Sequence, residues 1–142
     1  MTVRPESVWD ALADPGSYGY WVVGSKLISD ADADWPAPGS RFHHTVGVGP
    51  LKTSDHTEAL EAARPRRLAM RAKARPLGSA RVELTMTPKA GGTLVEMAEN
   101  PAGLSSALLV NPIVHLLTRG RNAESLMRLE ELALRIESGR RA

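Results

Sequence analysis

The sequence predicts an α+β protein, and three successive stretches of the chain support this. A short helical segment comes first, a long region of alternating apolar and polar residues with recurrent turn residues follows, and a long helical pattern ends the chain. The 142 residues are 42% hydrophobic and 24% charged, which is typical of one globular domain. We therefore expect residues 1–142 to form a single domain.

The composition excludes several classes of function. The chain contains no cysteine, which excludes disulfides, cysteine zinc sites and thiol nucleophiles. No apolar run approaches the ~20 residues of a membrane span, and no hydrophobic signal region follows Met1, so we expect a cytoplasmic protein. A net charge of +2 and an aromatic content of 4% disfavour a nucleic-acid partner. The glycines form no phosphate loop or dinucleotide fingerprint, so no cofactor is expected.

The helical segment near the start of the chain has clear boundaries. A helix is predicted over Glu6–Ala13, because Pro5 precedes it and Asp14-Pro15-Gly16 ends it. A second short helical turn is predicted over Ser17–Val23. Only Met1–Val3 precede the first helix, which is barely enough for a strand.

Six strands are predicted in the central region, and the loops between them set their pairing. The strands are expected near residues 25–32, 40–48, 52–62, 67–75, 79–87 and 92–100. Three connections are read as tight turns: Gly47–Leu51, a three-residue loop at Pro76–Gly78 and a four-residue loop at Pro88–Gly91.

The last three strands share one apolar face when they are paired through these loops. Met70 then lies opposite Leu84, and Leu84 lies opposite Val95. On the other face, Arg71 lies opposite Glu83. The predicted inner face consists of Leu68, Met70, Ala72, Val82, Leu84, Met86, Val95 and Met97. The predicted outer face is solvated and carries Arg67, Arg71, Lys73, Arg75, Arg81 and Glu83.

A long helix is predicted after Pro101. Asn111 and Pro112 form a helix start, and the helix should run to about Ser138 with Gly139 as its stop. Gly120 interrupts its interior and allows a kink. One face consists of positions 115, 119, 122, 126, 129, 133 and 136.

The predicted face of this helix changes character along its length. Its C-terminal half is apolar and includes Leu126 and Leu129, whereas its N-terminal half carries His115, Arg119 and Asn122. These polar residues either form the polar end of a pocket, with Arg119 holding a ligand carboxylate or carbonyl, or emerge into solvent.

This order of elements describes the helix-grip fold, and short motifs along nearly the whole chain agree with it. The motifs are Pro5–Trp9, Tyr20–Gly24, Arg64–Leu68, Gly92–Val95 and Arg121–Leu126. Through them the chain resembles the START-like (SRPBCC) superfamily of pollen-allergen-like proteins, polyketide cyclases/dehydrases and lipid-transport proteins.

The resemblance implies a curved antiparallel sheet of six to seven strands wrapped around the C-terminal helix, with two short helices after the first strand. It also implies a cavity that holds lipids, polyketides or other apolar molecules, in which some members catalyse cyclisation or dehydration and many only bind. Here the first strand would be Met1–Arg4 at most. Either the true start of the protein lies upstream of Met1, or one edge of the sheet is short. An open edge would allow pairing into a homodimer.

Three histidines lie on two neighbouring predicted strands. His43 and His44 are consecutive strand residues that point to opposite faces, so no metal site is predicted from them and His56. The strand pairing has two solutions. A two-residue turn at Gly49-Pro50 places His44 opposite Asp55, whereas a three-residue loop places His44 opposite His56.

An inward position for Leu60 favours the longer loop, because it puts His56 and Glu58 on the inner face with Phe42 and His44. A histidine beside a carboxylate in an apolar cavity can act as a general acid or base. The simpler alternative is a polar lining satisfied by water or by neighbouring groups.

Two further residues have two interpretations each. Glu99 continues the inward set of Val95 and Met97 and either ends the strand in solvent or faces a ligand. Trp21 belongs either to the core or to an aromatic wall.

The sequence therefore predicts a protein that binds a small apolar or amphiphilic molecule between the sheet and the long helix. Its predicted ligand-binding residues are Trp21, Phe42, Met70, Leu84, Met86, Met97, Glu99, His115, Arg119, Asn122, Leu126 and Leu129. The alternative is a cyclase or dehydratase with His44, His56 and Glu58 as catalytic groups. A second alternative is a protein-interaction module with a filled cavity.

Overall fold

The computed structural model describes residues 1–23, 25–48, 51–73, 79–102 and 112–141. Helix α1 (Pro5–Leu12), the 3-10 turn η1 (Pro15–Ser17) and helix α2 (Tyr18–Trp21) come first, and helix α4 (Pro112–Arg141) comes last. Between them lie β1 (Ser25–Ala31), β2 (Arg41–Val48), β3 (Leu51–Ala63), β4 (Arg67–Lys73), β5 (Ser79–Lys89) and β6 (Gly92–Ala102).

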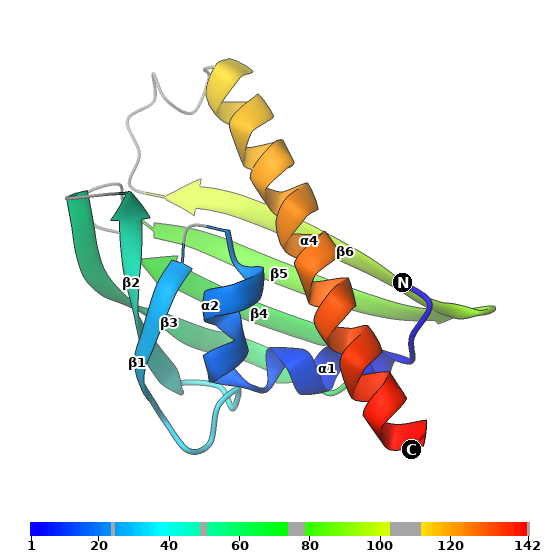
Figure 1. Ribbon diagram of the computed structural model, residues 1–142. Helices are drawn as coiled ribbons and strands as arrows, with labels where there is room; N and C mark the ends of the chain where they lie inside the picture. Colours follow the sequence, from blue (N-terminus) through cyan, green and yellow to red (C-terminus); the bar gives the residue numbers. More distant parts are fainter. Residues whose placement is uncertain (24, 49–50, 74–78, 103–111, 142) are drawn as a thin grey trace.

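The six strands form one antiparallel sheet in which each strand pairs with the next along the chain. Figure 1 shows a curved sheet with α1, α2 and α4 on the same side and α4 running diagonally across it. This arrangement confirms the predicted α+β class and is the helix-grip arrangement. Among the described helices, none is long and apolar enough to span a membrane.

The expected position of the two short helices is wrong, because both precede the first strand. Arg4 is already the N-cap of α1, and residues 1–3 form no strand. The N-terminal segment pairs with the edge strand β6 through Met1 alone. The Met1 amino group donates to the Thr93 carbonyl at 2.9 Å, and the Met1 carbonyl accepts from the Thr93 N–H at 2.8 Å.

Gly92 allows this close approach of the N-terminal segment to β6. A Cβ atom at position 92 would lie 2.0 Å from the Met1 carbonyl oxygen. Only glycine therefore fits at this point of the sheet edge.

Helix α1 begins and ends for the reasons that the sequence gives. Pro5 stands at its first position, where no N–H donor is needed. After the helix, the Asp14 carboxylate accepts from the Gly16 N–H at 3.1 Å. The Leu12 carbonyl at the helix end accepts from the Tyr18 hydroxyl at 2.8 Å and from the Trp35 indole N–H at 3.0 Å. The predicted helix is confirmed to within one residue at each end.

The pairing predicted for β4 and β5 is wrong by two residues. Met70 lies opposite Val82 rather than Leu84. Arg71 lies opposite Arg81. The last described pair is Lys73 with Ser79, and the predicted loop at Pro76–Gly78 lies outside the described residues. An even shift leaves every side chain on its expected face.

The pairing predicted for β5 and β6 is also wrong by two residues. Leu84 lies opposite Met97 rather than Val95. Pro88 continues strand β5, and the turn is tighter than predicted, with Gly91 at a φ of 81°. Pro88 lies opposite Thr93 of β6. The N–H and carbonyl of Thr93 bond to Met1 and not to β5, so strand pairing requires no N–H from residue 88.

The residues predicted on the inner face lie there despite both shifts in pairing. The core of the described residues contains Leu68, Met70, Val82, Leu84 and Met86, each at most 7% exposed, and Val95 and Met97 are partly buried against it. The hydrophobic alternation therefore identified the face correctly even where it did not identify the partner.

Helix α4 begins at Pro112, as predicted, but Gly139 does not end it. The helix continues to Arg141, and its last turn carries two arginines that complement the negative end of the helix dipole. Gly120 lies within the continuous helix. On the predicted apolar face, Leu129 and Ala133 are fully buried.

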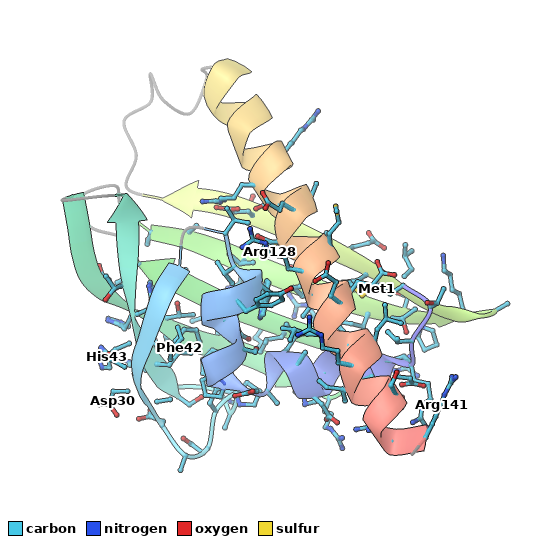
Figure 2. All side chains as sticks on the ribbon, viewed as in Figure 1. Met1, Asp30, Phe42, His43, Arg128 and Arg141 are labelled. Atoms are coloured by element: carbon cyan, nitrogen blue, oxygen red, sulfur yellow. The ribbon has the colours of Figure 1, made fainter. Side chains whose placement is uncertain are left out.

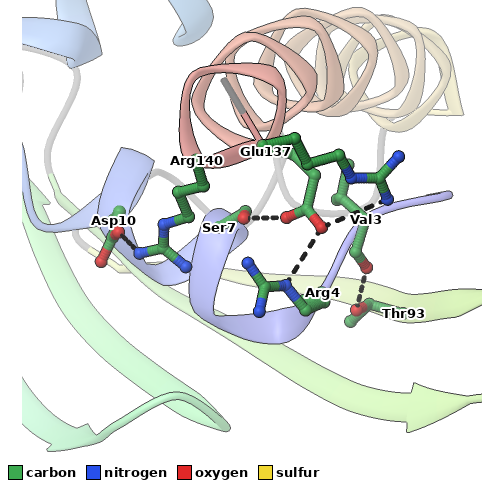
Figure 3. Close-up of polar contacts among 8 residues, drawn as sticks. Val3, Arg4, Ser7, Asp10, Thr93, Glu137 and Arg140 are labelled. Carbon is green, nitrogen blue, oxygen red and sulfur yellow. Dashed lines mark hydrogen bonds and ion pairs between the residues drawn. The ribbon is translucent and has the colours of Figure 1, made fainter.

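The C-terminal half of α4 is held to α1 and α2 by polar contacts. Glu137 is 5% exposed and accepts hydrogen bonds from the buried Ser7 hydroxyl and from Arg4 Nε, the latter at 3.0 Å (Figure 3). Arg140 pairs with Asp10 of α1. Nearer the start of α4, the Ser125 hydroxyl accepts from the N–H of Val23, two residues after α2, at 3.1 Å. We call Arg4, Ser7 and Glu137 the helix clamp.

Candidate functional site

The pairing of β2 with β3 decides which polar side chains reach the inner face. His43 lies opposite His56, and His44 lies opposite Asp55. The favoured three-residue loop is therefore wrong, and the pairing of the two-residue alternative is observed. Figure 2 shows the consequence on β2, where the neighbours Phe42 and His43 point to opposite sides of the strand.

A β-bulge explains why Leu60 was misleading. The pairing of β3 with β4 shifts between Ala59, which lies opposite Met70, and Glu61, which lies opposite Ala69. Leu60 is the extra residue of this bulge, so the inward side chains change from odd to even positions across it. Counting back from Leu60 therefore assigns the first half of β3 to the wrong face.

The three predicted catalytic residues do not gather on one face. His44 is 6% exposed and lies on the inner face. The side chain of His56 lies on the outer face, where its ring centroid is 6.0 Å from that of His43. Glu58 also lies outside, and its carboxylate is 3.7 Å from the guanidinium of Arg41.

The inner face carries a different group, which we call the inner polar cluster: His44, Asp55 and Thr57. Asp55 and Thr57 are 4% and 5% exposed. His44 Nε2 and Thr57 Oγ1 lie 3.0 Å apart, at hydrogen-bond distance. The Asp55 carboxylate accepts from the His56 backbone N–H at 3.0 Å. The sequence analysis missed Asp55 and Thr57 as inner-face residues, although they alternate with the buried Ala59.

Burial controls the ionisation of His44. It lowers the pKa of the imidazole and outweighs the His56 carbonyl and the Asp55 carboxylate, which both favour the protonated ring. His44 is therefore neutral near neutral pH. Its Nδ1 atom is buried and makes no hydrogen bond of normal geometry within the described part of the chain.

An aromatic wall continues from the inner polar cluster toward α2. Phe42 lies 5.9 Å from His44 and 4.7 Å from Tyr18, between ring centroids. Tyr18 in turn lies 4.9 Å from Trp21. Trp21 is fully buried, and its indole Nε1 has no hydrogen-bond partner among the described residues. Trp35 also contacts Phe42, at 4.6 Å.

The remaining predicted ligand-binding residues divide between the interior and the surface. Met70, Leu84, Met86 and Leu129 are buried, and Met97, Leu126 and Asn122 are partly buried. Arg119 is exposed, as in the alternative in which the helix emerges into solvent. His115 belongs to α4, but its side chain is outside the described residues.

Glu99 lies opposite the inward-facing Val82 and is bound by α4. Both of its carboxylate oxygens accept from Arg121 at 2.7 Å. The Glu99 side chain is 13% exposed, whereas that of Arg121 is 44% exposed. The sequence analysis missed Arg121 because it lies off the predicted helix face.

The outer face is solvated, and four of its charged residues form ion pairs. Arg67 and Arg81 both contact Glu83, at 3.1 and 2.9 Å, and both also contact Glu61. Glu83 therefore pairs with these two arginines instead of the predicted Arg71. Among the described residues, no group of three potential metal ligands comes together.

Comparison with protein families identifies this arrangement. Residues 1–133 match the model of the family described as polyketide cyclase/dehydrase and lipid transport. The chain belongs to this family. Membership confirms the predicted resemblance and implies a cavity for a small hydrophobic ligand. No curated protein matches the chain significantly.

Solved structures agree on the fold. Protein CV1439 from Chromobacterium violaceum is 18% identical, with a TM-score of 0.71 over 94% of this chain and 91% of that one. Protein NE0264 from Nitrosomonas europaea is 20% identical, with a TM-score of 0.66 over 95% and 90%. CalU16 from Micromonospora echinospora is 21% identical, with a TM-score of 0.57 over 99% and 78%. At these identities the likeness concerns the fold alone.

Proposed function

We propose that this chain, as one domain, binds a small apolar or amphiphilic molecule between the inner face of the sheet and α4. The observation that carries the proposal is the inner polar cluster within an otherwise apolar and aromatic layer. His44, Asp55 and Thr57 are each at least nine-tenths buried, and the Phe42 ring lies 5.9 Å from that of His44.

Burying polar groups beside apolar ones is costly unless the polar groups are paired. A few convergent polar groups in an apolar lining are typical of sites that orient a ligand with one polar end. Met70 and Met86 supply adaptable apolar surface, because the unbranched thioether side chain fits ligands of irregular shape. The family's cavity and this lining together favour an amphiphilic ligand.

Native mass spectrometry of the purified protein tests this proposal, followed by solvent extraction and identification of whatever is released. We expect a bound apolar or amphiphilic mass. Leu126→Trp should fill the space between α4 and the sheet and abolish uptake while the protein still folds. Leu134→Trp is the matched control, since Leu134 is 39% exposed on the same helix. Uptake that survives Leu126→Trp would place the site elsewhere, and a clean apo mass with no uptake would favour an interaction module.

A second candidate function is acid–base catalysis of a cyclisation or dehydration. The observation that favours it is the neutral, buried His44, hydrogen-bonded through Nε2 to Thr57. A neutral imidazole can take a proton from a bound substrate and return it. His56 and Glu58 have no part in this version, because they lie on the outer face.

His44→Gln separates this candidate from simple binding. The variant should bind an apolar probe as the wild type does but lose about 10²-fold or more in turnover of any substrate identified by extraction. His56→Gln, on the opposite face, is the control and should keep both properties. Equal turnover in both variants would exclude His44 as the catalytic group.

A further inference from the structure

Trp21 is a fully buried tryptophan whose indole N–H has no hydrogen-bond partner within the described chain. We propose that this N–H is the donor that selects the ligand, and that it selects a neutral carbonyl-type oxygen, as in a ketone or quinone, over a carboxylate. The inference rests on the proposed binding function and names the ligand class of that site.

The position of Trp21 places it beside the proposed ligand. It is the last residue of α2, and its ring packs on Tyr18, whose hydroxyl reaches the Met70 sulfur on β4 at 3.7 Å. Two residues later, the Val23 N–H is bound by Ser125 of α4. Trp21 therefore lies in the layer between the helices and the sheet.

The hydrogen-bond donors of the neighbouring aromatic residues are paired within the protein. The Tyr18 hydroxyl and the Trp35 indole N–H are buried, and both donate to the Leu12 carbonyl. Buried donors of this kind are nearly always paired, because an unpaired donor loses its hydrogen bonds to water and gains none in the protein. The Trp21 N–H is the exception beside them. An indole N–H can only donate, so its partner must be an acceptor.

The charges around the layer explain why the acceptor should be neutral. Arg121 is bound to Glu99 through both carboxylate oxygens. Arg128 is bound to Glu124 and to the Tyr20 carbonyl. The inner face itself carries the buried Asp55 carboxylate. A ligand carboxylate would therefore share the inner face with a like charge, while Arg121 and Arg128 are already bound and Arg119 is exposed, which makes its burial unfavourable.

The aromatic wall adds a shape requirement. The rings of Trp21, Tyr18, Phe42 and His44 follow one another at centroid distances of 4.9, 4.7 and 5.9 Å. Such a wall favours a flat ligand that packs against ring faces and edges. The Nδ1 atom of His44 at the far end offers a second polar contact for it.

Three two-ring probes of similar shape test the proposal on the whole protein: 2-acetonaphthone, 2-isopropylnaphthalene and 2-naphthoate. Isothermal titration should show the ketone binding about tenfold more tightly than the hydrocarbon, which is the net value of one hydrogen bond. The carboxylate should bind most weakly. Trp21→Phe should remove the advantage of the ketone and change the hydrocarbon affinity by less than about threefold. Trp9→Phe, at another buried tryptophan, should leave the preference intact.

A second measurement does not depend on the stability of Trp21→Phe. In ¹⁵N–¹H spectra of the wild type, the three tryptophans give three indole signals. The ketone should shift the Trp21 indole proton downfield, whereas the hydrocarbon should not. The signal of Trp35, which is bound to Leu12, serves as the internal control.

The outcomes separate this inference from the proposed function. Equal binding of ketone and hydrocarbon, with no downfield shift at Trp21, would overturn the inference and leave apolar binding standing. Tightest binding of the carboxylate would also overturn it and would indicate a cation at the site. Binding of none of the probes, together with a clean apo mass, would overturn both.

Discussion

Two groups of buried polar side chains in this protein differ in how completely they are paired. In the helix clamp, the Glu137 carboxylate receives hydrogen bonds from Ser7 on one oxygen and Arg4 on the other. Around the inner polar cluster, His44 Nδ1 and Trp21 Nε1 are buried without partners in the described residues, as is His56 Nε2 on the outer face. The first group holds α4 in place, and the proposed function assigns the second group to a ligand.

The two groups also differ in charge. The hydrogen bond from Ser7, together with the positive charge of Arg4, lowers the pKa of Glu137 and keeps it ionised. Burial lowers the pKa of His44 and keeps it neutral. The helix clamp thus holds a paired charge, whereas the inner polar cluster holds a neutral ring that is hydrogen-bonded at Nε2 only.

The largest expected effect comes from removing the apolar contact on which both regions depend. Leu129 on α4 is fully buried, so Leu129→Ala should lower the free energy of unfolding by about 2–5 kcal/mol. Urea unfolding followed by circular dichroism measures this. Leu134→Ala, at a 39% exposed position of the same helix, should cost about 0.5 kcal/mol or less. A similar loss in both variants would mean that α4 is not seated as described.

A smaller effect is expected from opening the helix clamp. Ser7→Ala removes a buried hydrogen bond to a carboxylate and should cost roughly 1–3 kcal/mol in the same assay. Ligand affinity, measured by titration with the three naphthalene probes, should not change. Reduced affinity with unchanged stability would reverse the roles assigned to the two regions.

The helix clamp should also depend on pH in a defined direction. The pKa of Glu137 is lower in the folded than in the unfolded state, so its contribution is complete above the ordinary glutamate pKa of about 4.3. It is lost as the pH falls through the lower folded pKa. Urea midpoints of wild type and Glu137→Gln should therefore differ most near neutral pH and converge in acid. A constant difference down to acid pH would show that the charge is not involved.

His44 should give a weaker pH dependence in a higher window. Its pKa is lower in the folded state, so the unfolded state binds the proton first and stability falls as the pH drops below about 6.5. His44→Phe should flatten the stability profile between neutral pH and the lower folded pKa of the ring. His43→Phe, on the exposed neighbour, is the control, and an equal change in both would argue against burial as the cause.

The smallest effect is expected at the ion pair between α4 and β6. Arg121 is 44% exposed, so Arg121→Gln should cost at most about 1 kcal/mol, and less in high salt. It would also leave the Glu99 carboxylate without its partner beside the proposed site. Tighter binding of 2-naphthoate by this variant would contradict the account of why carboxylates are excluded.

The periodicity of the sequence predicted most of the fold. The helix start at Pro112, the start of α1 to within one residue and the position of each strand are confirmed, because capping residues and alternation are local signals. Two strand pairings were wrong by two residues, and between β5 and β6 the reason is that the turn is shorter than predicted. This error left the faces intact because side chains alternate with a period of two.

The site was harder to predict than the fold because its members depend on distant or irregular features. With the bulge at Leu60, His56 and Glu58 lie on the outer face, and Asp55 and Thr57 lie beside His44 on the inner face. The local sequence pattern does not indicate this bulge. The pairing of Glu99 with Arg121 depends on how α4 crosses the sheet, which only the folded chain determines.

The bulge in β3 also affects how related chains should be compared. Residues before Leu60 and residues after it obey opposite rules for which side chain points inward. Loss of that one residue in a homologue would turn the first half of the strand inside out and move histidine, aspartate and threonine between the interior and the solvent. An alignment that places a single gap a few positions away would therefore exchange interior and surface residues. Insertions and deletions at this point can thus change which side chains line the interior without any substitution among them.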